Sequence, residues 1–284
     1  MNRWERRIER KLKALAGSFC LLSRDPAQLH DSIHRARRLN KQLRALLALL
    51  PRSTQRAVRK VVRDQKCIVK QLGVFRDEAI FQQNMKALAE TVACSVDPVT
   101  RSSRGEGGDA ISKKLATALN RLAANVTRIH HRLRESDHSI TRRSVAKRYR
   151  RSFRVFLKIS RDLSTASSLE KWHDLRKRGK VLEYQTKFLR KYSHQARDPI
   201  AGVIVDLGKH LGQLNDLAKA KECLNLRQTP LGVPILIAEK ASEELLQEIE
   251  CGCEKAKLES EDLLKKLVPA IESICRKTLR EIIE

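Results

Sequence analysis

The sequence has few aromatic residues and few residues that interrupt helices. Aromatic side chains make up 4% of the 284 residues, and there are 11 glycines and 7 prolines. Leu, Ala, Lys, Arg and Glu are abundant instead. These residues lose little free energy on entering a helix, whereas the residues that favour strands are scarce. The composition therefore predicts an all-α protein.

Cysteine patterns and long apolar segments are also lacking. None of the 7 cysteines has the paired C-x-x-C spacing of a zinc site, and Cys251-Gly252-Cys253 has no histidine nearby. We interpret the cysteines as reduced thiols of a cytosolic protein. The first residues, "MNRWERRIERK", lack the apolar stretch of a signal peptide. No apolar run approaches the ~20 residues of a membrane span. A cytoplasmic protein without metal, cofactor or membrane partner is expected.

Negative charge is scarce relative to positive charge. The chain has 59 Lys and Arg against 33 Asp and Glu, which gives a formal net charge of +26. From Glu222 onward acidic residues outnumber basic ones, so the positive excess lies before that point. A hydrophobic content of 41% is too high for a disordered basic tail. A folded chain with this charge repels itself, and we therefore expect a polyanionic partner.

Two parts of the sequence repeat one pattern of histidine, arginine and lysine. "IHRARRLNKQ" at 33–42 aligns with "WHDLRKRGKV" at 172–181, at an offset of 139 residues. "LGVFRD" at 72–77 aligns with "LGQLND" at 211–216 at the same offset, and "FCLLSRD" at 19–25 aligns with "FLKISRD" at 156–162 at an offset of 137. Three matched blocks in one order indicate a tandem duplication.

The duplication predicts the organisation of the chain. We expect two four-helix bundles, residues 1–135 with a loop at about 95–110 and residues 139–284, related by an approximate internal twofold. In each half a third helix can start at a proline, Pro51 or Pro199, and should end at the LG-x-x-[RN]-D motif, which we interpret as a turn. Asp25 and Pro26 suit the start of a second helix. The last helix, at about 233–284, should break near Cys251-Gly252-Cys253.

The repeated motif H-x-x-R-[RK]-x-x-K predicts a basic helix face. At about 100° per residue, its four positions fall in one narrow sector, and no acidic residue stands at i+4 to pair with them. Leu39, Leu43, Leu46, Leu47 and Leu50 form the opposite, inward face. The helices before the motif carry matched basic positions at an offset of 137. The candidate polyanion ligands are Arg6, Arg10, Lys11, Lys13, His34, Arg37, Arg38, Lys41 and Arg44, and in the second half Arg143, Lys147, Arg148, Arg150, His173, Arg176, Lys177, Lys180 and Lys187.

A regular row of Arg and Lys suits a ligand with a regular row of anions. Guanidinium groups bind phosphate oxygens in bidentate fashion, and ammonium groups act as point charges. If the two halves face each other, four basic stripes converge on a groove or channel. His34 and His173 either contact the ligand or hold a neighbouring helix. Asp77 and Asp216 are expected to be structural, by capping a helix or by orienting an arginine.

Three function classes fit these features. Non-catalytic binding is the leading interpretation, because no P-loop, paired-carboxylate metal site or nucleophile with its base is apparent. Nucleic-acid binding is equally compatible with the charge, but aromatic residues for base stacking are scarce and no helix-turn-helix or zinc-finger pattern is apparent. An enzyme acting on phosphate chains would use Asp77, Asp216 and the histidines as acid–base groups.

The stretches "IHRARRLNKQLRALL" and "LEKWHDLRKRGKVLEY", each followed by an LG motif, resemble the two halves of the conserved-histidine α-helical domain, CHAD. The resemblance spans nearly the whole chain. It implies two four-helix bundles around a basic central cavity that binds inorganic polyphosphate. It also implies location at polyphosphate granules.

Overall fold

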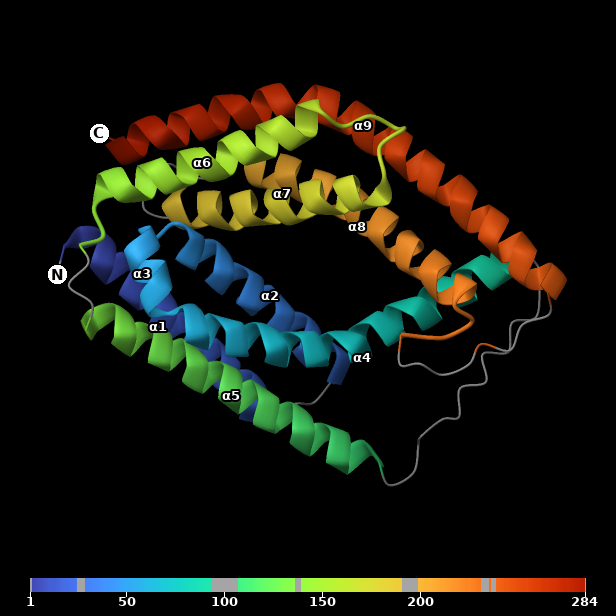
Figure 1. Cartoon of the computed structure of the whole chain (residues 1–284), viewed down its shortest axis with the longest axis horizontal. Helices are drawn as coiled ribbons and strands as arrows, with labels where there is room; N and C mark the ends of the chain where they lie inside the picture. Colours follow the sequence, from blue (N-terminus) through green and yellow to red (C-terminus); the bar gives the residue numbers. More distant parts are fainter. Residues whose placement is uncertain are drawn as a thin grey trace.

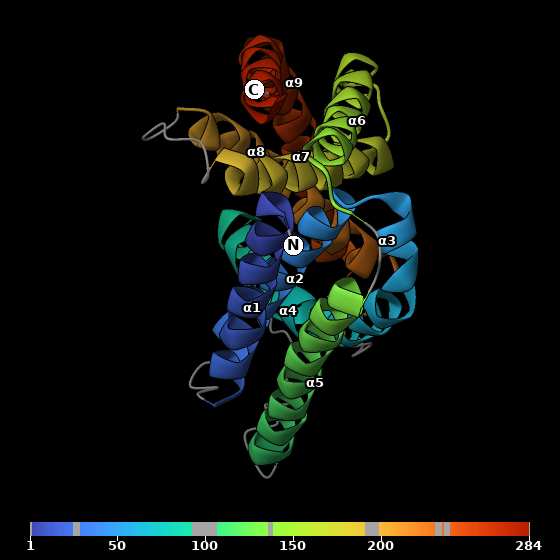
Figure 2. The same cartoon turned by 90° about the vertical axis from the view of Figure 1, so that its left-hand side faces the viewer.

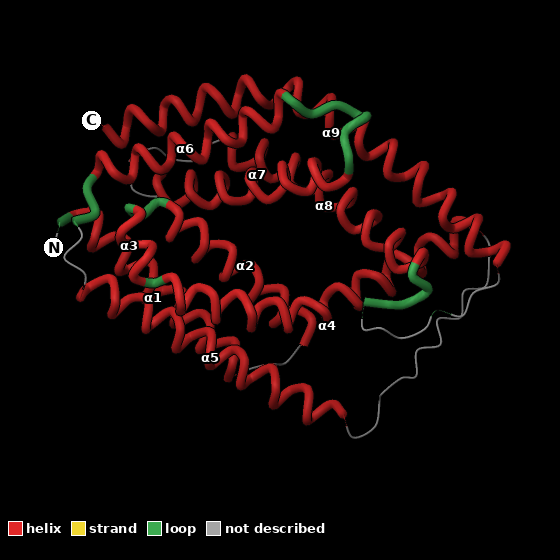
Figure 3. Tube along the Cα trace, viewed as in Figure 1, coloured by secondary structure: helices red, strands yellow, loops and turns green. Residues whose placement is uncertain are grey.

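The computed structural model describes residues 2–24, 29–92, 107–135, 139–190, 199–230, 235 and 239–283. Over these ranges the protein is helical and contains no strand, as the composition predicts (Figures 1 and 3). The helices are α1 (Arg3–Arg24), α2 (Leu29–Ala48), α3 (Arg52–Ala57), α4 (Arg59–Val92), α5 (Gly107–Glu135), α6 (Arg142–Arg161), α7 (Leu169–Arg190), α8 (Pro199–Asn225) and α9 (Glu239–Ile283).

Each half of the chain has the same pattern of helix neighbours. In the first half α1 packs on α5 and α2, and α4 packs on both α2 and α5. In the second half α6 packs on α9 and α7, and α8 packs on both α7 and α9. The halves meet through α2 against α7, and through α4 against α8 and α9. Figures 1 and 2 show α6 and α9 on one side of the molecule and α1 and α5 on the other, with α2 and α7 between them.

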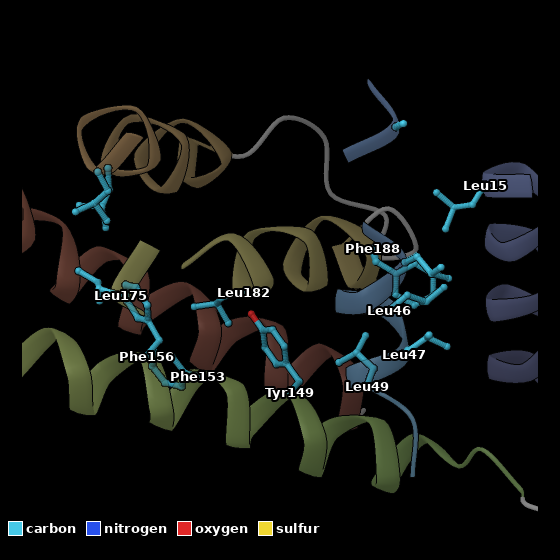
Figure 4. Close-up of a cluster of buried hydrophobic side chains, with 14 of the residues drawn as sticks. Leu15, Leu46, Leu47, Leu49, Tyr149, Phe153, Phe156, Leu175, Leu182 and Phe188 are labelled. Atoms are coloured by element: carbon cyan, nitrogen blue, oxygen red, sulfur yellow. The ribbon is translucent and has the colours of Figure 1, made fainter. Parts of the chain in front are cut away.

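One hydrophobic cluster includes residues from both halves. The predicted inward face of α2 is confirmed, because Leu43, Leu46, Leu47 and Leu50 are buried and Leu39 packs against them. In Figure 4 the leucines near the end of α2 lie in the same cluster as Phe188 of α7 and the aromatic side chains of α6. A polar contact crosses the same junction: Gln185 Nε2 of α7 donates to the Ala45 carbonyl of α2 at 3.1 Å, and both residues are buried. Trp4 and Trp172 are also buried core residues.

The predicted turn at the LG motifs is wrong. Gly73 and Asp77 lie inside α4, and Gly212 and Asp216 lie inside α8. The glycines make room for basic side chains instead. A Cβ on Gly73 would stand 2.7 Å from Arg37 Nη1, and a Cβ on Gly212 would stand 3.6 Å from Arg176 Nη2. The LG motif therefore marks where an arginine of the preceding motif crosses a neighbouring helix.

The predicted break at Cys251-Gly252-Cys253 is also wrong, since α9 continues from Glu239 to Ile283. A single glycine costs a helix only about 1 kcal/mol relative to alanine. Gly252 packs against α8 closely, because a Cβ there would stand 3.3 Å from Leu217 Cδ1. This close contact between two helices favours a continuous α9 with a glycine at that position.

Other predicted boundaries have mixed outcomes. The proline starts are confirmed: α3 follows Pro51 and α8 begins at Pro199. Residues 95–106 of the predicted loop lie outside the described residues. The remaining residues, 107–110, belong to α5, which begins at Gly107. Glycines are tolerated there because the first turn of a helix makes few of the internal hydrogen bonds that an interior turn makes. The Asp25-Pro26 start lies outside the described residues, as does the 136–138 boundary between the halves.

Candidate functional site

The two copies of the histidine motif are brought close together by the contact between α2 and α7. Burial raises the pKa of Tyr184 on α7 to about 12. The charges of Arg38 on α2 and Arg176 on α7 both act against this rise. The two guanidinium groups therefore lie close enough to act on one phenol. We call the eight motif side chains the basic face; they are His34, Arg37, Arg38, Lys41, His173, Arg176, Lys177 and Lys180.

Arg37 is held in place by α4. Its Nη1 donates to the Gly73 carbonyl at 3.0 Å and lies 3.4 Å from Asp77 Oδ1. The other oxygen of Asp77 accepts a hydrogen bond from Lys219 Nζ of α8 at 2.6 Å. Asp77 thus links α2, α4 and α8, which include both halves of the chain. The contact between Asp77 and Arg37 fits orientation of an arginine, one of the two predicted structural roles, and the role itself stays a prediction. Helix capping is excluded because Asp77 lies inside α4.

Lys180 and Lys187 share one buried carboxylate. Glu183 is 5% exposed, and its two oxygens lie 2.9 Å from Lys180 Nζ and 2.6 Å from Lys187 Nζ. Burial by itself would raise the pKa of Glu183. The hydrogen bonds from Lys187 and Lys180 outweigh burial and hold this pKa below its usual value of 4.5. Both lysines therefore stabilise the fold of α7 in addition to any contact with a ligand.

The basic face retains positive charge despite these pairs. Asp77 and Glu183 each contact two cations, and one carboxylate balances the charge of only one of them. Arg38, Arg44 and Lys177 are exposed, and none of them has a carboxylate partner in the part of the chain that the structure describes. The face is therefore able to attract anions.

The two histidines of the motif have different surroundings. His34 is exposed, whereas His173 is half-buried. Burial lowers the pKa of His173 below its usual value of 6.5, and the nearby charges of Lys177 and Arg176 lower it further. The neighbouring Asn215 of α8 acts in the opposite direction. The neutral form of His173 is thus favoured near neutral pH.

The basic residues of α1 and α6 are less closely connected to the basic face. Lys11 Nζ donates to Gln42 Oε1 of α2 at 3.1 Å, and Arg148 Nε donates to the Ala48 carbonyl of α2 at 3.1 Å. Lys13 pairs with Glu9, which also contacts His130. The remaining predicted ligands on these two helices are exposed, and their side chains make no hydrogen bond or ion pair with another described residue; they are Arg6, Arg10, Arg143, Lys147 and Arg150. Convergence of all four stripes stays a prediction.

Sequence reasoning missed three residues that shape the site. Lys219, Glu183 and Asn215 contact Asp77, the two lysines and His173 respectively. At the offset of 139 their counterparts are Ile80, Arg44 and Arg76, so none of the three is duplicated. A search restricted to duplicated positions cannot find them. The spacing of Glu183 from Lys180 (i+3) and from Lys187 (i+4) was the signal available for the glutamate.

Asp216, the counterpart of Asp77, contacts a neighbouring amide. Its Oδ1 accepts from Asn215 Nδ2 at 3.2 Å, inside α8.

In the described ranges, no group of three or more His, Cys, Asp or Glu side chains is placed to hold a metal ion. None of the helices in these ranges is both long and apolar enough to cross a bilayer.

The described residues form an all-helical protein in which α2 and α7 pack together and carry exposed basic side chains. The chain belongs to the CHAD family, since the model of the CHAD domain matches residues 6–225. The match extends from α1 to the end of α8 and confirms the family resemblance seen in the sequence. No curated protein and no solved structure matches the chain.

Proposed function

We propose that the protein binds inorganic polyphosphate on the basic face without cleaving it. The main observation is that α2 and α7, which carry the two copies of one motif, pack against each other, and that Arg38 and Lys177 on these helices are exposed. Membership of the CHAD family supports the same ligand. Cations along α2 and α7 recur at about one helical turn, 5.4 Å, which suits a flexible chain of phosphates.

We also propose that the two halves are four-helix bundles related by an approximate twofold. The support is the matching pattern of helix neighbours, with α2 against its counterpart α7 and α4 against its counterpart α8. Contact between equivalent helices is what a twofold axis between the halves produces. Such an arrangement lets one polymer contact both copies of the motif.

Binding rather than cleavage is supported by the state of Asp77. Its carboxylate already contacts Arg37 and Lys219, and this arrangement fits a structural role better than an acid–base role. Pure protein incubated with long-chain polyphosphate and Mg²⁺ should leave the chain length unchanged on a gel. Shortening that disappears in the Asp77→Asn variant would show that the protein is an enzyme.

A competition experiment tests the choice of ligand. Labelled polyphosphate bound to the protein is displaced with duplex DNA, and labelled DNA is displaced with polyphosphate, at several salt concentrations. We expect polyphosphate to displace DNA at a much lower concentration of phosphate groups than the reverse, and both affinities to fall with salt. The opposite ranking would identify a nucleic-acid-binding protein.

A cytoplasmic location at polyphosphate granules follows from this proposal. A fluorescent fusion of the protein should co-localise with polyphosphate-rich bodies and disperse when cellular polyphosphate is depleted. An unchanged distribution after depletion would contradict the proposed location.

A further inference from the structure

A separate pocket of about 440 Å³ lies where α2, α3 and α4 meet. Its volume is in the range of small-molecule sites, roughly 300–1,000 Å³. Four arginines from these three helices line it: Arg44, Arg52, Arg56 and Arg59. The other lining residues are Leu47, Ala48, Gln55, Val58 and Val62. We call it the arginine pocket.

The positive charge of the arginine pocket is not balanced. No lining residue is acidic. In the described ranges, no carboxylate pairs with any of the four lining arginines. Arg52 and Arg56 stand four residues apart on α3, where like charges repel. A further positive charge, that of Arg148, lies near Arg52. Burial and the charges of Arg151 and Arg52 lower the pKa of Arg148. A bound anion would relieve this repulsion.

Hydrogen bonds from three other positions fix the frame of the pocket. Gln55 Nε2 donates to the Leu50 carbonyl at 2.8 Å and ties α3 to the end of α2. Arg148 of α6 donates to the Ala48 carbonyl at 3.1 Å, and Arg132 of α5 donates to the Ala57 carbonyl at 3.2 Å. These bonds satisfy carbonyl groups at the ends of α2 and α3. The four guanidinium groups thus project from a fixed backbone, which lowers the entropic cost of binding a ligand.

We propose that the arginine pocket binds a compact oligophosphate group, such as the three linked phosphates of inorganic triphosphate or of a nucleoside triphosphate. Several adjacent phosphates offer enough oxygens for four bidentate guanidinium groups, whereas a single phosphate engages only some of them. Of these four arginines, only Arg44 was predicted as a ligand, because it extends the basic face of the histidine motif. Arg52, Arg56 and Arg59 lie outside the basic face, so this inference goes beyond the binding of long chains proposed above.

The two sources of the oligophosphate group differ in their use of the apolar lining. Leu47 and Val58 are buried, and Ala48 and Val62 are partly buried, so the pocket also offers apolar surface. Inorganic triphosphate contacts only the arginines. A nucleoside triphosphate can in addition place its base against the apolar side. Tighter binding of ATP than of triphosphate therefore identifies the nucleotide as the better ligand, and equal binding identifies the phosphate group alone.

Calorimetric titration with inorganic triphosphate and with ATP tests the proposal. The pocket variant is Arg52→Gln/Arg56→Gln, and the control is Arg121→Gln/Arg134→Gln, which removes two exposed arginines of α5. We expect the pocket variant to lose at least about tenfold in affinity for both ligands, because each lost guanidinium removes charged hydrogen bonds. The control and an Arg38→Gln/Lys177→Gln variant of the basic face should stay within about twofold.

Two results would overturn the proposal: unchanged affinity in the pocket variant, or an equal loss in the α5 control. The second result would show that only overall charge matters. The melting temperature of each variant is measured first. Should the α3 variant be unfolded, Arg44→Gln/Arg59→Gln replaces it, with the same expected loss. Loss of long-chain binding in the basic-face variant with intact triphosphate binding would separate the two sites.

Discussion

The helices that carry the two copies of the histidine motif differ three residues after the motif ends. Arg44 of α2 is exposed, whereas its counterpart on α7 is the buried Glu183. The glutamate contacts Lys180 and Lys187, while the counterpart of Lys187 on α2 is Ala48. In the second half, part of the repeated charge therefore stabilises the fold. In the first half, the corresponding residue, Arg44, lines the arginine pocket.

The histidine and aspartate positions differ in the same way. His34 is exposed and His173 is half-buried beside Asn215. Asp77 links two cations, and Asp216 accepts from a neighbouring amide instead. The comparison shows that residues at duplicated positions have different neighbours in the two halves.

The largest loss of stability is expected when the buried carboxylate of Glu183 loses its two lysine partners. The Lys180→Met/Lys187→Met variant leaves Glu183 without its two cations, and we expect a loss of about 3 kcal/mol in the free energy of unfolding. Addition of Glu183→Leu should recover much of this loss. Arg44→Met, the change at the counterpart position, should stay within about 0.5 kcal/mol. Urea unfolding of the four proteins measures these values, and a stable lysine double variant would contradict the structural role.

The next effect separates two neighbouring arginines of α2. Arg37→Ala removes the bonds to the Gly73 carbonyl and to Asp77, and should lower the free energy of unfolding by about 1–2 kcal/mol. Arg38→Ala should change stability by less than about 0.5 kcal/mol and weaken polyphosphate binding instead. Thermal unfolding and binding titration are compared for both variants. Equal losses of stability would remove the distinction between them.

A smaller effect is expected at the two glycines of the LG motifs. Gly212→Ala has room for its methyl group and should stabilise α8 by up to about 1 kcal/mol through helix propensity. Gly73→Ala displaces the end of Arg37, so the lost contacts should offset that gain. The difference in melting temperature between the two variants measures this asymmetry. A larger gain for Gly73→Ala would show that Arg37 is not held there.

The smallest effect is a pH dependence of binding through His173. Its pKa lies below 6.5 in the free protein, and a bound polyanion should raise it because the charged form is then favoured. Binding is therefore coupled to proton uptake, and affinity should rise as pH falls toward and below 6.5. The His173→Gln variant should show a weaker pH dependence than His34→Gln. Equal dependence in the two variants would contradict this assignment.

Much of the fold could be predicted because the relevant signals are local. Composition indicated helices, proline positions indicated helix starts, and the spacing of the leucines of α2 indicated its buried face. The LG motif and Gly252 were misread because a glycine suggests a turn when its neighbours in space are unknown. Arg37 and Leu217 supply those neighbours in the folded protein.

The candidate site was predicted in part for the same reason. Duplicated charge identified the basic face, including Arg38 and Arg176. It did not identify Lys219, whose counterpart is Ile80, or the arginines of α3, which have no part in the repeated motif. Their importance depends on tertiary packing between helices that are distant in sequence, and single-sequence patterns do not carry that information.

The salt dependence of polyphosphate affinity tests the central claim most directly. Titrations across a range of salt compare the wild-type protein with Arg38→Gln, with Lys177→Gln, with both together, and with Lys114→Gln/Arg121→Gln on α5. If one polymer contacts both halves, each single change weakens binding. In the double variant the negative slope of log affinity against log salt should become shallower by about two. The α5 control keeps the wild-type slope. A double variant with the wild-type affinity and slope would contradict the account.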